Sequence, residues 1–227
     1  MKNLFLLLMI PFVGFSQQIK VIEDFGIWTG ISLEKNILNN ANLILEKQIR
    51  TFKNSTKIDD YLIQLALQNA INKKINFSGK IRYTYDLKRF NLSENNFRYS
   101  LSLTYKRLIM KNLSIRYRLQ HQKEFINFYN YFLNESNEQN VFFKSVRNKL
   151  KLIYQYNDMH RFYGSIEFFR LHEVFRRPYF NKFRILVGDL FTTQIRELDI
   201  AIVIERELNT NQPYSFVFLK TIYKIKK

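Results

Sequence analysis

The chain of 227 residues contains no cysteine, only three prolines and only six glycines. Without cysteine it can form no disulfide, no thiolate nucleophile and no cysteine-ligated metal centre. After the N-terminal segment it also lacks the ~20 consecutive apolar residues that a transmembrane helix needs. These absences exclude a disulfide-stabilised domain and a helical membrane protein.

Proline is scarce, and its positions fit an all-β chain. Pro11 lies in the apolar N-terminal segment, Pro178 lies between two segments of alternating polarity, and Pro213 stands at the start of the last such segment. Because proline cannot donate to a β-ladder, its absence from the interiors of these segments favours strands there.

The N-terminus predicts export. Lys2 is followed by an apolar segment from Leu4 to Phe15, which is too short to span a bilayer, and polar residues begin at Gln17. This order is typical of a secretory signal peptide, so we expect residues 1–16 to be removed and residues 17–227 to form one domain. A short buried strand or helix is the alternative interpretation. Export argues against a nucleic-acid partner, although the formal net charge is +17.

An alternation of apolar and polar residues runs through the rest of the chain. Segments of about a dozen residues follow this period of two, and the breaks between them alternate between short and long, which predicts an up-and-down meander. Bacterial outer-membrane barrels have even strand numbers, so we expect ten or twelve strands. Eleven segments qualify: 24–35, 41–51, 59–71, 74–86, 95–107, 112–122, 142–156, 160–171, 180–190, 195–207 and 213–225.

The alternation alone does not say which solvent the apolar face meets. A soluble barrel turns that face inward, whereas a membrane barrel turns it toward lipid. The segments exceed the usual strand length of about 5–6 residues and match the ~9–11 residues that cross a bilayer. Their apolar faces carry few charges. Aromatic residues recur near segment ends, where a membrane-interface girdle would lie: Trp28, Tyr61, Tyr85, Tyr105 and Tyr154.

We therefore predict an all-β, antiparallel transmembrane barrel located in the outer membrane. Its partners would be the lipid of that membrane, including lipopolysaccharide, whose phosphates basic residues at strand ends could bind. Two alternatives remain open. One is an envelope enzyme that acts on lipid or glycan, and the other is a soluble periplasmic barrel that binds an apolar ligand.

The polar face is the main functional signal in the sequence. In the membrane interpretation it lines the lumen and carries both signs of charge. A ring of basic residues there could select a small anionic solute. Alternatively, the charges only stabilise a plugged interior, and from the sequence we favour this second interpretation. The predicted basic residues are Lys80, Arg82, Arg98, Arg116, Arg118, Arg147, Lys149 and Arg184, with Glu46, Glu167 and Glu205 as acidic partners.

Several phrases resemble one known family. DFGIWTGISLEKNI at 24–37, ANLILEKQIR at 41–50, SVRNKLKLIYQY at 145–156 and YGSIEFF at 163–169 are similar to the domain of unknown function 2490 family, as is a closing strand near Tyr223. The resemblance implies an exported outer-membrane barrel of Gram-negative bacteria, and it implies no reaction. The lumen-facing positions that it implies are Glu46, Arg50, Arg147, Lys149 and Glu167.

The sequence offers no catalytic, metal-binding or cofactor-binding motif. The three histidines, His121, His160 and His172, form neither an HExxH nor an HxH pattern. A serine hydrolase could still assemble across strands from Ser114 or Ser145 with His121 or His160. Any serine-rich barrel offers such sets, so we expect no enzyme activity, metal or cofactor.

Overall fold

The computed structural model describes residues 21–87, 93–128, 140–173, 177–210 and 212–226. In these ranges no helix is long and apolar enough to cross a membrane. The expected signal peptide, residues 1–16, lies outside the described residues.

Each of the eleven alternating segments becomes a strand. The largest difference in bounds is that the sixth strand continues to Phe128, six residues beyond the expected 112–122. The strands are β1 (Ile22–Leu38), β2 (Ala41–Phe52), β3 (Lys57–Ala70), β4 (Ile75–Leu87), β5 (Ser93–Met110), β6 (Leu113–Phe128), β7 (Asn140–Gln155), β8 (His160–His172), β9 (Tyr179–Thr192), β10 (Arg196–Glu207) and β11 (Tyr214–Lys226).

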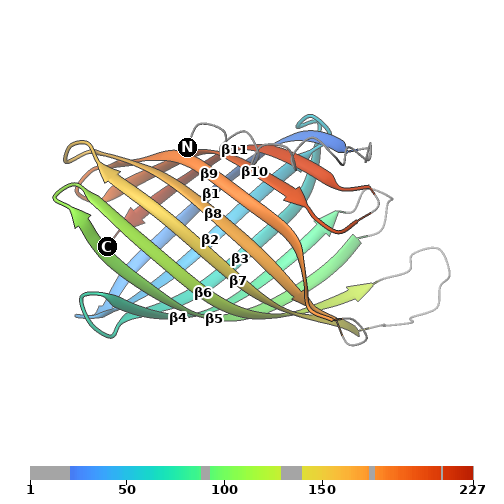
Figure 1. The fold of residues 1–227 in the computed structure, drawn as a ribbon, viewed down its shortest axis with the longest axis horizontal. Coiled ribbons are helices and arrows are strands. Elements are labelled where there is room, and N and C mark those ends of the chain that lie inside the picture. Colours follow the sequence, from blue (N-terminus) through green and yellow to red (C-terminus); the bar gives the residue numbers. More distant parts are fainter. Residues whose placement is uncertain (1–20, 88–92, 129–139, 174–176, 211, 227) are drawn as a thin grey trace, which may run out of the picture.

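The strands close into one up-and-down barrel, in which neighbours along the chain are also neighbours in the wall (Figure 1). Every pair is antiparallel except β1 and β11, which run parallel from Ile22 opposite Tyr214 to Glu34 opposite Lys226. The all-β barrel is confirmed, with eleven described strands in place of the even number expected. Each turn reverses the chain, so the first and last strands of an odd meander run the same way and close as a parallel pair.

Short turns join the strands at one end of the barrel, which we call the short-turn end. In the turns between β3 and β4 and between β7 and β8, Asn72 and Asn157 play the same part. The side-chain oxygen of each accepts the backbone N–H groups two and three residues further on, at 2.7 to 2.9 Å. Such asparagine turns hold tight reversals. We call the opposite end the long-loop end.

The connection between β2 and β3 lies at the long-loop end and is shorter than expected. The expected segments 41–51 and 59–71 left residues 52–58 between them, but the strands leave only residues 53–56. Lys53, Asn54 and Ser55 all have positive φ angles, between 53° and 65°. The carboxylate of Asp24 on β1 accepts the backbone N–H groups of Lys53 and Asn54 at 2.9 Å each. These bonds stabilise a backbone conformation that non-glycine residues seldom adopt.

The outer face of the wall is apolar. Among the described residues, large apolar and aromatic side chains are exposed along the strands from Phe25 on β1 to Leu219 on β11. On β5 they occupy every second position: Phe97, Tyr99, Leu101, Leu103 and Tyr105.

The inner face is mostly polar but contains one apolar cluster. Trp28, which we expected in the outer aromatic girdle, lies in this cluster and is only 8% exposed. It shares its strand face with Gly26 and Ser32, so the period of two turns it inward. We call this group the apolar cluster; it comprises Trp28, Ile153, Tyr163, Leu186, Leu190, Ala201, Val203 and Phe218.

Candidate anion site in the barrel interior

Alternation and register together place the predicted charged residues side by side inside the barrel. Residues directly opposite each other on neighbouring strands point to the same face of the wall. Arg82 on β4 lies opposite Arg98 on β5, and Arg118 on β6 lies opposite Lys149 on β7. Lys149 in turn lies opposite Glu167 on β8. These residues therefore share one face of the wall, and this is the inner face, because they line a cavity in the interior.

A cavity of about 460 Å³ lies in the interior, and we call it the central cavity. Eleven basic and four acidic residues line it, so its wall carries a formal surplus of positive charge. Of the predicted residues, Glu46, Lys80, Arg82, Arg98, Arg118, Arg147, Lys149, Glu167 and Arg184 line this cavity.

Two of the predicted residues lie elsewhere. Glu205 lines a second, smaller cavity of about 100 Å³, which it shares with Trp28 and Arg184. Arg116 shares the inward face of β6 with Arg118 but does not line the central cavity. It lies close to the short-turn end, because it is the fourth residue of its strand.

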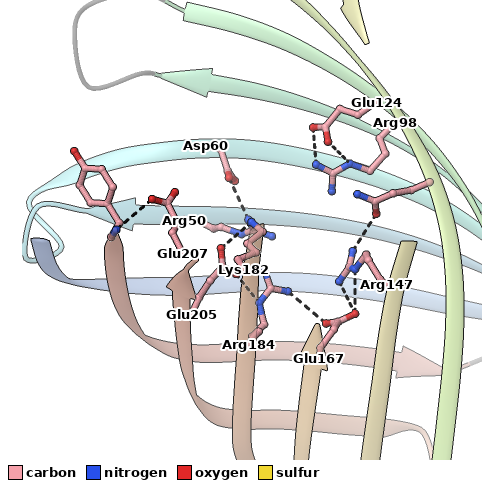
Figure 2. Close-up of polar contacts among 12 residues, drawn as sticks. Arg50, Asp60, Arg98, Glu124, Arg147, Glu167, Lys182, Arg184, Glu205 and Glu207 are labelled. Carbon is pink, nitrogen blue, oxygen red and sulfur yellow. Dashed lines mark hydrogen bonds and ion pairs between the residues drawn. The ribbon is translucent and has the colours of Figure 1, made fainter. Parts of the chain in front are cut away.

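Glu167 is the centre of the largest charge cluster. Its carboxylate is 1% exposed and lies 2.8 Å from Arg147 Nη2 and 2.9 Å from Arg118 Nη2. Arg184 Nη1 lies 3.9 Å from the other carboxylate oxygen, as Figure 2 shows. One buried carboxylate therefore neutralises only part of the charge of three guanidinium groups.

Further acid–base pairs lie toward the long-loop end (Figure 2). Arg98 donates two hydrogen bonds to the Glu124 carboxylate, at 2.5 and 3.0 Å. Glu205 accepts from both Arg184 and Lys182, the latter at 2.9 Å. The sequence interpretation did not single out Glu124 or Lys182. Both residues occupy inward positions in the alternation of β6 and β9, and this position in the sequence could have identified them.

A separate network lies toward the short-turn end. Glu197 pairs with Arg161 at 2.7 Å, with Lys224 at 2.6 Å and with Lys226 at 2.9 Å. Asp199 pairs with Lys220 at 2.6 Å. Paired charges therefore occupy both ends of the barrel.

Several bases in the middle of their strands have no such partner. Neither Lys80 nor Lys149 forms a hydrogen bond or ion pair with any described residue, although both line the central cavity. Arg82 binds only a neutral group, the amide oxygen of Gln64, at 2.7 and 3.1 Å. Within the described part of the chain, bases without an ion pair therefore lie in the middle of the interior, and Arg116 near the short-turn end is a further one.

The barrel wall separates Ser145 from the histidines that the sequence offered as its catalytic partners. Ser145 lines the central cavity, whereas His121 lies on the outer face, because its neighbours Gln120 and Gln122 line the cavity. His160 pairs with Asp189 at 2.6 Å and is packed between Phe162 and Phe191 on the outside of the barrel. In the described ranges, no group of three metal-ligating side chains occurs either.

Comparison with known proteins finds no match: no family model, no curated protein and no solved structure. The resemblance to the domain of unknown function 2490 family therefore stays a prediction. The case for a function rests on the two faces of the barrel and on the central cavity.

Proposed function

We propose that this protein is an exported, integral outer-membrane β-barrel, and that its interior is a narrow pore for small anions. The observation that carries the proposal is the polarity of the wall, which is apolar outside and charged inside. A soluble barrel would show the reverse.

The outer face supports the membrane location. Monomeric soluble proteins rarely expose an apolar patch larger than about 300–600 Å². Here exposed apolar side chains follow each other along successive strands, as Ile63, Leu65 and Leu67 do on β3. Hydrocarbon solvates such a surface, and closure of the barrel leaves no strand edge unpaired within it. Tyr85, Tyr105 and Tyr154 are exposed near strand ends, in keeping with an aromatic girdle.

The inner face supports anion passage over a purely structural plug. A plug needs its bases neutralised, since unpaired charges in an enclosed space are costly. The pairs at Glu167 and Glu197 meet this need, but Lys80 and Lys149 form no ion pair with a described residue. Basic rings of this kind favour anions in pores. The alternative of a soluble barrel that holds an apolar ligand would need an apolar cavity, and the central cavity is lined by charge.

The first test concerns location. The full chain would be expressed in a Gram-negative host, and its envelope would be fractionated. We expect the protein in the outer-membrane fraction, extracted only by detergent, with a gel mobility that changes on boiling. Recovery in the osmotic-shock fluid would contradict the membrane location.

The second test concerns passage. The purified barrel would be inserted into planar bilayers, and the reversal potential would be measured in a KCl gradient. We expect preference for chloride, and the variant Lys80→Glu/Lys149→Glu should lose this preference because it reverses two charges at the cavity. Lys144→Glu reverses one charge on the outward face of β7 and should leave selectivity unchanged. A barrel without conductance would leave only the structural role.

A further inference from the structure

One side of the interior combines small polar side chains with unpaired bases. Lys80 on β4, Ser100 on β5, Gln122 on β6 and Ser145 on β7 lie opposite one another in a single row across four strands. All four line the central cavity. Because serine is short, this row leaves space in front of the wall. We call the inward faces of β4 to β7 the open wall.

The open wall presents hydrogen-bond donors around that space. Lys80 and Lys149 contribute ammonium groups, and Arg82 contributes guanidinium N–H groups. Ser100 and Ser145 add hydroxyl groups. Lysine and arginine donate without accepting, so the dominant chemistry of this wall is donation to an acceptor with negative charge.

The electrostatic surroundings of Lys80 are repulsive. Arg118, Arg82 and Arg147 repel its charge, and Glu46 attracts it. Lys149 likewise has Glu167 on one side and the cations Arg118 and Lys151 near it. Glu167 is already shared by three arginines. An anion from solution would relieve this repulsion.

Size and charge narrow the class of anion. The cavity of about 460 Å³ is much larger than a chloride ion, since each water molecule occupies about 30 Å³ of liquid. The two N–H groups of an arginine fork match two oxygens of a carboxylate or phosphate, a geometry that a single spherical halide does not offer. Several uncompensated bases also favour more than one negative charge on the ligand.

We propose that the open wall is a binding site for a small organic phosphate, with the phosphate group held by Lys80, Arg82 and Lys149. Ser100, Ser145 and Gln122 complete the hydrogen bonds, and the remaining volume takes the organic part of the ligand. The site deepens the proposed function and rests on it only for the route by which the ligand enters.

The test measures binding in detergent solution, where no conductance is needed. Glucose 6-phosphate, inorganic phosphate, citrate, glucose and chloride would be titrated calorimetrically at equal ionic strength. We expect glucose 6-phosphate to bind more tightly than inorganic phosphate or citrate, and neither glucose nor chloride to give a saturable signal. Lys80→Met and Lys149→Met should each weaken binding about tenfold or more, because each removes a charge-assisted hydrogen bond.

Matched variants keep the result specific to the open wall. Lys144→Met removes the same charge from the outward face of β7, and its affinity should equal that of the unchanged protein. Lys80→Arg should restore most of the affinity lost in Lys80→Met. Boiling-dependent gel migration would show that each variant forms the barrel, and circular dichroism would check its strand content.

The outcomes separate the site from the pore. Saturable phosphate binding without any conductance supports the site and contradicts the pore. Chloride-selective conductance, with glucose 6-phosphate no better than chloride, overturns the site and leaves the pore. Equal losses of affinity in Lys80→Met and Lys144→Met would also overturn the site, because the effect would then be one of net charge. Citrate binding as tightly as glucose 6-phosphate would overturn the preference for phosphate.

Discussion

The two sides of the barrel interior are both built from strands of alternating polarity, but different side chains occupy the space in front of them. On the open wall of β4 to β7, serines, glutamines and unpaired bases surround the central cavity. On the inward faces of β8 to β11 and β1, which we call the packed wall, lie all members of the apolar cluster except Ile153 of β7, and Val203 is fully buried. The acids Asp199 and Glu205 each pair with lysine or arginine there. The difference shows that side-chain volume and acid placement decide whether an inward face becomes a core or a site.

The largest expected effect comes from removing Trp28. Its ring packs edge-on against Phe218, with centroids 6.5 Å apart, and lies 4.2 Å from the Arg50 guanidinium carbon. Trp28→Ala should lower the free energy of unfolding by about 3–5 kcal/mol, because it leaves a cavity in the packed wall. Urea titration in detergent micelles would measure this. Ser100→Ala on the open wall should lower the free energy of unfolding by less than about 1 kcal/mol. Equal losses for the two variants would contradict the difference in packing between the two walls.

Glu167 lies where the two walls meet, and its loss should cost nearly as much. Glu167→Gln keeps the shape but removes the one described carboxylate that forms ion pairs with Arg147 and Arg118. Because a buried pair that loses one partner leaves uncompensated charge, we expect a loss of about 3 kcal/mol in unfolding free energy. The same titration measures it, with 50 mM phosphate added in a second series. If the loss stays below that of Ser100→Ala, the cluster around Glu167 does not stabilise the barrel.

Two glycines compare a crowded inward position with an uncrowded outward one, because Gly188 lies on the packed wall and Gly79 lies on the outer face of β4, opposite Leu67 and Leu101. A Cβ at Gly188 on β9 would lie 2.4 Å from the Ile200 carbonyl oxygen, whereas one at Gly79 on β4 would meet only a Leu101 methyl at 3.7 Å. Gly188→Ala should therefore destabilise by about 1–3 kcal/mol through overpacking. Gly79→Ala should stabilise by about 0.5–1 kcal/mol, because alanine loses less backbone entropy in a strand. Thermal unfolding of both variants, followed by circular dichroism, checks the opposite signs.

The smallest expected effect is a gain in stability on the open wall. Lys149 has no ion pair with a described residue; Glu167 attracts its charge, and Arg118 and Lys151 repel it. Lys149→Met should leave the unfolding free energy unchanged or raise it by up to about 1 kcal/mol, since the repulsion that it removes and the apolar chain that it buries offset the lost attraction to Glu167. Urea titration without added anion is the measurement. A clear loss of stability would mean that Lys149 is neutralised in the folded protein, which contradicts an empty site for an anion.

Much of the fold could be predicted from the sequence because a strand has a fixed period. The alternation in residues 97–106 correctly separated an inner from an outer face, and the same period placed Arg147 and Glu167 inside. Strand bounds were harder to predict, as in β6, because its last residues keep the ladder without a clear polar signal. Trp28 was assigned to the outer girdle because its aromatic character was weighed above its position in the period. Its place beside Gly26 on the same face was the better guide.

The strands, their order and the faces of most side chains follow from the sequence alone, because the backbone pleat turns successive residues to opposite sides. The contacts across the interior follow only from the closure and register of the barrel. Closure made β1 and β11 a parallel pair, and the register around the barrel assigned Glu167 to Arg147 and Arg118 while Lys149, directly opposite it, received no ion pair. Ion pairs join side chains that are distant in the chain. A local sequence pattern carries no information about which of these side chains meet across the interior.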